Sequence, residues 1–136
     1  MSAVVLDASV LIKLYINEDG SRRAVNAVKK AEQLLAPDLI WSEAGNILWK
    51  YVRREELHCD AAESMLQDML QLPMLITASA DLVGLALELA VQANRSVYDC
   101  LYLALAVKAN AVMLTADQRL ANALAGTALG KLVRGL

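Results

Sequence analysis

Short runs of apolar residues alternate along this chain with longer segments whose apolar residues recur every three or four positions. The runs are typical of buried β-strands and lie at residues 3–6, 34–36, 74–76, 111–114 and, more weakly, 131–133. The periodic segments predict amphipathic helices over 40–51, 62–70 and 82–93, whereas residues 101–107 are apolar all round, as in a helix buried on every side. Strands separated by such helices imply right-handed crossovers and a parallel sheet covered on both faces. We therefore expect an α/β fold.

The composition is that of one globular domain. The 136 residues contain no repeat, linker or low-complexity tract, so we expect a single domain spanning 1–136. The 15 acidic and 13 basic side chains give a net charge of −2, which excludes a strongly basic nucleic-acid-binding coat. A segment that spans a bilayer needs about 20 apolar residues, and no uncharged run of this sequence is nearly that long. The first residues lack the basic start that is typical of a signal peptide. Cys59 and Cys100 form no zinc or disulfide pattern. These features predict a cytoplasmic protein with two reduced thiols.

Four acidic residues lie close to the predicted carboxyl ends of strands. Asp7 comes directly after the first strand, and Asp117 follows the fourth strand together with Thr115. Glu43 lies one to two turns into the helix after the second strand, and Asp99 lies in the first turn of the buried helix. Ligands of open α/β sheets bind outside the carboxyl ends of the strands, so we expect these four carboxylates to converge at one edge.

Each acid also has an explanation as a helix-capping or ordinary helical residue, because acids favour helix N-termini. Their joint placement is harder to explain in that way. Unpaired carboxylates in one cleft repel one another and raise each other's pKa unless a cation lies among them. A cluster of oxygen ligands suits Mg²⁺ or Mn²⁺.

The residues that the chain lacks narrow the chemistry further. His58 is the only histidine, which excludes a two-histidine ribonuclease and leaves a Ser-His-Asp triad with little support. We interpret His58 as a solvated or capping residue. The sequence holds neither a P-loop nor a dinucleotide-binding motif. A metal-activated water that attacks a phosphodiester is therefore the chemistry we expect.

Four sequence motifs resemble those of PIN domains of the VapC toxin type, in the family's order, at residues 4–13, 41–50, 96–104 and 114–120. The resemblance implies a three-layer, Rossmann-like fold with a five-stranded parallel sheet of order 3-2-1-4-5, and a Mg²⁺- or Mn²⁺-dependent ribonuclease. It also implies a toxin that a cognate VapB-like antitoxin neutralises, and a homodimer. Carried across to this chain, the metal-binding and catalytic acids are Asp7, Glu43, Asp99 and Asp117, with Ser9, Asn46 and Thr115 as polar support beside them.

Other functions remain open. The motifs do not separate a toxin from a PIN-domain nuclease of RNA processing, or from a degenerate PIN scaffold that only binds a partner. A haloacid-dehalogenase-like phosphatase also has an aspartate after its first strand, but it needs a second one where this chain has Ser9. A phosphoacceptor receiver domain needs an adjacent pair of acids and a lysine after a late strand, where this chain has Thr115.

Two surfaces are candidates for binding macromolecules. Cations that follow Glu43 on one side of its helix predict a path for the RNA backbone, which two further cations near the acids extend. These residues are Lys50, Arg53, Arg54, Arg119 and Lys13; the alternative is a merely solvated basic face. For an antitoxin helix we expect an apolar surface on the stripe of residues 62–69 or on the short helix of residues 11–16. The alternative there is that both stripes are buried in the core.

Overall fold

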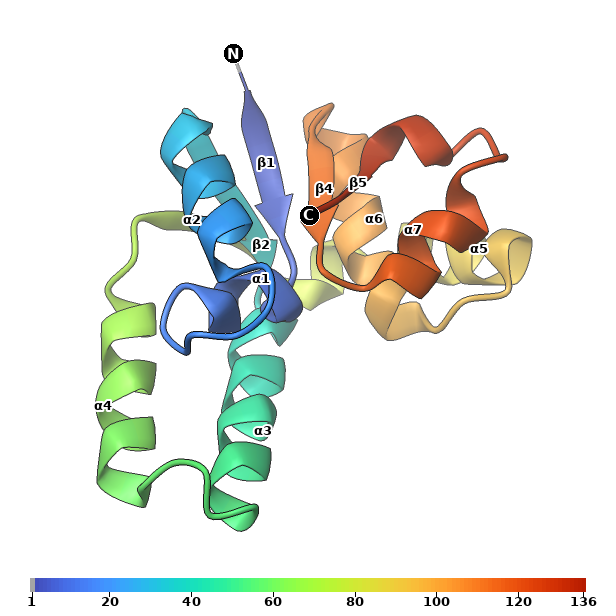
Figure 1. Ribbon diagram of the computed structural model, residues 1–136. Helices are drawn as coiled ribbons and strands as arrows, with labels where there is room; N and C mark the ends of the chain where they lie inside the picture. The colour runs from blue at the N-terminus through green and yellow to red at the C-terminus, as the bar shows by residue number, and fades with distance from the viewer. Residues whose placement is uncertain (1) are drawn as a thin grey trace.

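The five apolar runs form one sheet in the computed structural model, which describes residues 2–136 (Figure 1). All neighbouring strands pair in parallel, in the order β3-β2-β1-β4-β5. The strands are β1 (Ala3–Leu6), β2 (Gln33–Pro37), β3 (Met74–Thr77), β4 (Val112–Thr115) and β5 (Val133–Gly135). The parallel sheet and its strand order are thus confirmed.

Helices cover the sheet from two sides, as right-handed crossovers require. The crossovers from β1 to β3 carry α1 (Ala8–Lys13), α2 (Ser21–Lys30), α3 (Leu39–Arg53) and α4 (Cys59–Leu70). The opposite side carries α5 (Val83–Ala93), α6 (Val97–Ala109) and α7 (Gln118–Leu124). Two short 3₁₀ helices, η1 (Ser79–Asp81) and η2 (Gly130–Leu132), precede α5 and β5. Helices α3 and α4 form a hairpin that extends beyond the sheet (Figure 1).

Helix α6 is the centre of the core. Residues 101–106 are all buried, and the helix packs against β1, β2 and β4 on one side and α5 on the other. The expectation of burial on every side is wrong only at the last position, where Val107 is 41% exposed because the final turn of α6 faces solvent. Within residues 2–136, no helix has the length and apolar character needed to cross a membrane.

Two expectations about the sheet need correction at its edges. The fifth strand begins at Val133 rather than at Lys131, because residues 130–132 form η2. Gly130 packs against the end of α7 so closely that a Cβ there would lie 2.6 Å from the Leu124 carbonyl oxygen. Coverage on both faces fails at β3, an edge strand whose Leu75 is 55% exposed and whose Ile76 is 38% exposed.

The strand order places the carboxyl ends of β1 and β4 side by side. The register pairs Leu6 with Leu114, and the Asp7 N–H extends this pairing by donating to the Leu114 carbonyl at 3.4 Å. On one side of this pair of strands the chain moves toward β3, and on the other side it moves toward β5. Open α/β sheets bind their ligands at such a point of reversal. Asp7 and Thr115 therefore both reach this point.

Candidate active site

Asp7 is a buried carboxylate that is held by three donors. It is the N-cap of α1, where Oδ1 accepts from the Val10 N–H at 3.2 Å and from the Ser9 hydroxyl at 2.5 Å. Its Oδ2 accepts from the Thr115 hydroxyl at 2.5 Å. Burial raises the pKa of Asp7 to about 6, and the Glu43 charge adds to this effect, whereas the three hydrogen bonds oppose it.

Ser9 and Thr115 connect the ends of the two central strands. The Ser9 hydroxyl accepts from the Ala116 N–H at 3.0 Å while it donates to Asp7. The Thr115 hydroxyl accepts from the Asp117 N–H at 3.0 Å in the same way. Because each hydroxyl uses its proton on Asp7 and a lone pair on the segment after β4, the two loops hold a fixed position relative to each other.

Glu43 lies in the second turn of α3 and is partly buried. Its Oε1 accepts from the hydroxyl of Tyr102, a residue of α6, at 2.5 Å. Burial raises the pKa of Glu43; the Tyr102 hydrogen bond opposes this, and the charge of Asp99 adds to it. Two carboxylates from different helices are thus near enough to repel each other electrostatically.

Asp99 and Asp117 share a cation. Nη2 of Arg95 lies 3.3 Å from Oδ2 of Asp99 and 4.0 Å from Oδ2 of Asp117. Within residues 2–136, the Arg95 Nε is buried without a hydrogen-bond partner. Asp117 also caps α7, since its Oδ1 accepts from the Leu120 N–H at 3.2 Å. Ser96 caps α6 by accepting from the Asp99 N–H at 3.1 Å, which leaves the Asp99 carboxylate free for Arg95.

The four acids line one open cavity of about 440 Å³. Ser9, Asn46 and Lys50, three of the residues that the sequence placed near the acids, line it too. Thr115 is fully buried and reaches the site through Asp7. The cavity therefore collects acids from four separate segments of the chain, as the strand-end argument expected.

The remaining predicted cations lie outside the lining of this cavity. Lys13 is paired with Glu18 at 2.8 Å, and its side chain is only 13% exposed, so its ammonium is engaged elsewhere. Arg53 lies over the Trp49 ring, with 4.5 Å between its guanidinium carbon and the ring centroid. Arg54 pairs with Glu56 at 3.2 Å, and Arg119 is exposed at the start of α7.

Two residues whose side chains contact the acids were missed by sequence reasoning. Tyr102 lies three residues after Asp99, so helical spacing places both on one face of α6, but the apolar surroundings made it look like core. Arg95 lies four residues before Asp99, the spacing of a local ion pair, but it precedes the first turn of α6, where the sequence pattern predicts no helix. The contacts of Tyr102 with Glu43 and of Arg95 with Asp117 depend on the tertiary structure.

The donor set fits a hard divalent cation. Four carboxylates gather with one nearby guanidinium, and burial has already raised the pKa values of two of the acids. A bound cation would offset the repulsion among these groups, and oxygen ligands favour Mg²⁺ or Mn²⁺ over softer metals. The residues that would hold it are the four acids.

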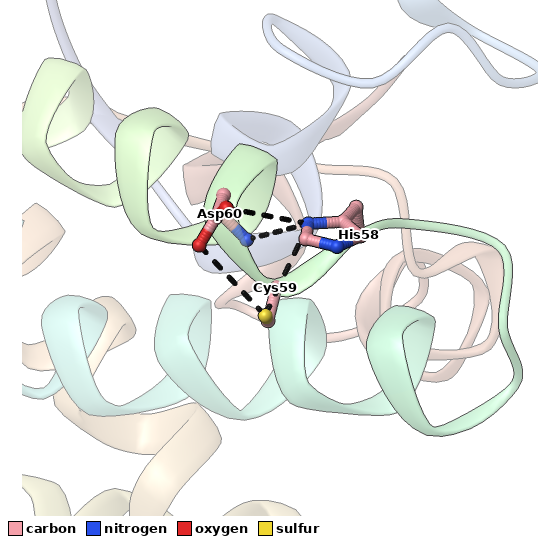
Figure 2. A group of neighbouring side chains, drawn as sticks. All are labelled: His58, Cys59 and Asp60. Atoms are coloured by element: carbon pink, nitrogen blue, oxygen red, sulfur yellow. Dashed lines mark hydrogen bonds and ion pairs between the residues drawn. The ribbon is translucent and has the colours of Figure 1, made fainter.

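His58, Cys59 and Asp60 form a second group of ligand-type side chains, at the start of α4 (Figure 2). The His58 Nδ1 accepts from the Asp60 N–H at 3.1 Å, so His58 is a capping residue, as expected. The His58 and Asp60 side chains are 73% and 85% exposed. Three consecutive surface residues, one of which already uses its nitrogen as a cap, do not make a built metal site. Cys59 and Cys100 are free thiols.

Comparisons with known proteins agree with this geometry. Residues 4–124 match the PIN domain family. The ribonuclease VapC3 of Pyrobaculum aerophilum is 37% identical over 120 residues, which cover 87% of this chain and 92% of that protein. The crystal structure of PAE2754 from the same organism superimposes with a TM-score of 0.71 at 26% identity, over 90% of this chain and 79% of that one. VapBC2 from Rickettsia felis, solved with a promoter DNA fragment, gives a TM-score of 0.64 at 13% identity, over 98% of both chains.

We expect Asp7→Asn to stabilise the protein at pH 8 in the presence of EDTA. The pKa of Asp7 is about 6 in the folded chain, above its ordinary value of 3.8, so the native state binds the extra proton between these values. The free energy of unfolding therefore falls as the pH rises from about 4 to about 6, by roughly 1–3 kcal/mol. Asparagine avoids this cost and can still cap α1. Thermal melting of the variant and the wild type at pH 4 and pH 8 measures the difference in stability.

The exposed Asp19→Asn is the matched control and should leave the melting temperature within about 2 °C at both pH values. An Asp7→Asn protein whose melting temperature differs from that of the wild type by the same amount at pH 4 and pH 8 would contradict the raised pKa of Asp7. Added Mn²⁺ should raise the melting temperature of the wild type more than that of Asp7→Asn.

Proposed function

The chain belongs to the PIN-domain family, and on that premise we propose that it is a metal-dependent ribonuclease, the toxin of a VapBC toxin–antitoxin pair. The observation that carries the proposal is the cavity that collects Asp7, Glu43, Asp99 and Asp117. The similarity to a curated VapC ribonuclease over most of both chains supports the activity. A PIN-domain nuclease of RNA processing has the same site, whereas a purely binding scaffold leaves the four intact acids unexplained.

In the proposed mechanism the chain holds the acids and directs the phosphate. A bound Mg²⁺ or Mn²⁺ supplies a water of lowered pKa and neutralises charge on the phosphate. Ser9 and Thr115 keep Asp7 in one orientation, and Arg95 restrains Asp99 and Asp117. Lys50, at the rim formed by α3, attracts the phosphodiester toward the acids.

The RNA follows α3 away from the cavity. Lys50 lines the cavity, and Arg53 lies exposed one turn later on the same side of the helix. Trp49 supports the Arg53 guanidinium from below and offers an aromatic surface, 52% exposed, on which a base could stack. Since the whole chain carries a net charge of −2, attraction of RNA needs locally concentrated positive charge, and Lys50 and Arg53 supply it next to the cavity.

The antitoxin occupies the groove between α3 and α4. This groove has a volume of about 250 Å³ and an apolar lining that includes Leu48, Trp49, Val52, Ala62 and Leu66. Met65 and Leu66 are only partly buried, so the apolar stripe of α4 retains accessible surface. An amphipathic helix in such a groove is a common mode of peptide recognition. The other candidate, the segment from Leu11 to Ile16, has its first two residues wholly buried.

A homodimer is the remaining part of the proposal. Val83, Leu87 and Val91 repeat every four residues along α5 and are 46%, 56% and 78% exposed. An apolar stripe of this kind on the outside of a helix is typical of an association surface. A cytoplasmic location also stays a prediction.

We expect Asp7→Asn, Glu43→Gln, Asp99→Asn and Asp117→Asn each to slow metal-dependent cleavage of single-stranded RNA by about 100-fold or more. An amide keeps the shape of the side chain but loses the charge that binds the cation. Cleavage assays in Mg²⁺ and in EDTA, with circular dichroism to check the fold, measure this. Asp60→Asn, on an exposed acid outside the cavity, is the control. Wild-type rates in two of the four variants would refute the site.

We expect Lys50→Glu combined with Arg53→Glu to weaken RNA binding and to flatten its salt dependence. Single-stranded RNA releases counterions with a log–log slope of about −0.7 per phosphate neutralised, so two lost cations change the slope by roughly one unit or more. Titrations in the Asp7→Asn background avoid cleavage. Lys29→Glu with Lys30→Glu, the same charge change on exposed α2 residues, should leave the slope unchanged. If the α3 pair did so too, the RNA path would lie elsewhere.

We expect Leu66→Gln to lower antitoxin affinity about 10-fold or more, because it places an amide in the apolar groove. Leu70→Gln is the matched control: it lies one turn later on α4, is 42% exposed and does not line the groove. Co-purification with the neutralising antitoxin measures both variants. Equal retention of the antitoxin by the two would place its docking site outside the groove.

A further inference from the structure

Tyr102 is a buried phenol whose hydroxyl faces the acidic cavity. Tyr102 is 2% exposed and lies in the middle of α6, the helix with the most buried residues among those described. The hydroxyl donates to Oε1 of Glu43 at 2.5 Å and accepts a hydrogen bond from the Ala8 backbone. Ala8 directly follows Asp7, so one hydroxyl connects the segments that carry three of the four acids: α6, α3 and the end of β1.

Glu43 depends on this contact more than the other acids depend on any single one. Asp7 accepts from three donors, and Asp99 and Asp117 lie beside Arg95. Within residues 2–136, the Tyr102 hydroxyl is the one donor to Glu43, and Oε2 accepts no hydrogen bond. A glutamate loses considerable rotamer freedom when it is fixed, so a single strong hydrogen bond decides which orientation it keeps.

The phenol is suited to this role. A buried tyrosine hydroxyl needs hydrogen-bond partners, and both partners of Tyr102 belong to the site. A phenol carries its proton near neutral pH, so the hydroxyl acts as a donor to the carboxylate. Phenylalanine would fill the same space in the core without this donor.

We propose that Tyr102 is a positioning residue that binds one oxygen of Glu43 and thereby presents the other oxygen to the divalent cation. The inference rests on the proposed metal site. Tyr102 itself does not hold the cation; it acts through Glu43, as hydrogen-bonding partners of metal-binding carboxylates commonly do.

The test is Mn²⁺ binding to EDTA-stripped protein, measured by titration calorimetry. Tyr102→Phe should weaken Mn²⁺ binding about 10-fold or more, which is the usual effect of losing such a partner. The matched control is Tyr51→Phe, which also removes a hydrogen bond between a tyrosine and a glutamate, that of Tyr51 to Glu18, but outside the cavity. It should bind Mn²⁺ within about twofold of the wild type.

A double variant separates positioning from mere structural support. In a Glu43→Gln background, Tyr102→Phe should weaken Mn²⁺ binding no further, because its effect passes through the Glu43 carboxylate. The same loss in both backgrounds, or Tyr102→Phe binding at the wild-type level, would overturn the proposal. If Tyr102→Phe did not fold, Glu43→Asp would replace it in the test, because the shorter side chain cannot reach the Tyr102 hydroxyl. Wild-type Mn²⁺ affinity of Glu43→Asp would then overturn the proposal. A wild-type protein that binds no Mn²⁺ would overturn the metal site itself.

Discussion

The burial of an ionisable carboxylate between the ends of β1 and β4 is the constraint on which this molecule depends. Asp7 is tolerated there because donors from α1, from the Ser9 side chain and from β4 converge on its two oxygens. Those donors meet only if β1 and β4 are neighbours, which is the point where the crossovers of the sheet change direction. The buried charge of the cavity can therefore be accommodated only in a sheet with this strand order.

Two of the acids both cap a helix and line the cavity. A carboxylate has two oxygens, and Asp7 and Asp117 use Oδ1 to cap a helix while Oδ2 faces another segment. On the sequence, capping was the alternative to metal binding for Asp7, Asp99 and Asp117. In the structure Asp7 and Asp117 are caps that also line the cavity, because a helix that begins soon after a strand places its N-cap at the carboxyl edge of the sheet. The capping hydrogen bond then fixes the orientation of the carboxylate and uses only one of its two oxygens.

Local pattern predicted the elements that depend on local order. The first four strands lie within a residue or two of the apolar runs, and strand-end reasoning brought the four acids to one cavity, although their roles stay proposals. Features that depend on tertiary contact were not predictable. The start of β5 at Val133 goes with η2, where Gly130 packs against the end of α7, and the hydrogen bond of Tyr102 has its partner 59 residues away. The pairing of Lys13 with Glu18 is formed by the turn after α1, whose conformation the apolar pattern does not predict.

Helix α3 presents a different interface on each of three faces. Ile40, Ala44 and Leu48 pack into the core; Glu43, Asn46 and Lys50 line the cavity; Gly45, Trp49 and Val52 line the groove. Few positions of such a helix can be substituted freely, since most of its residues contribute to the core, the cavity or the groove. If the groove binds the antitoxin, as proposed, a substitution on α3 that alters antitoxin binding also endangers the cavity. Divergence of partner specificity among paralogues should therefore accumulate on α4, which contributes no residue to the lining of the cavity.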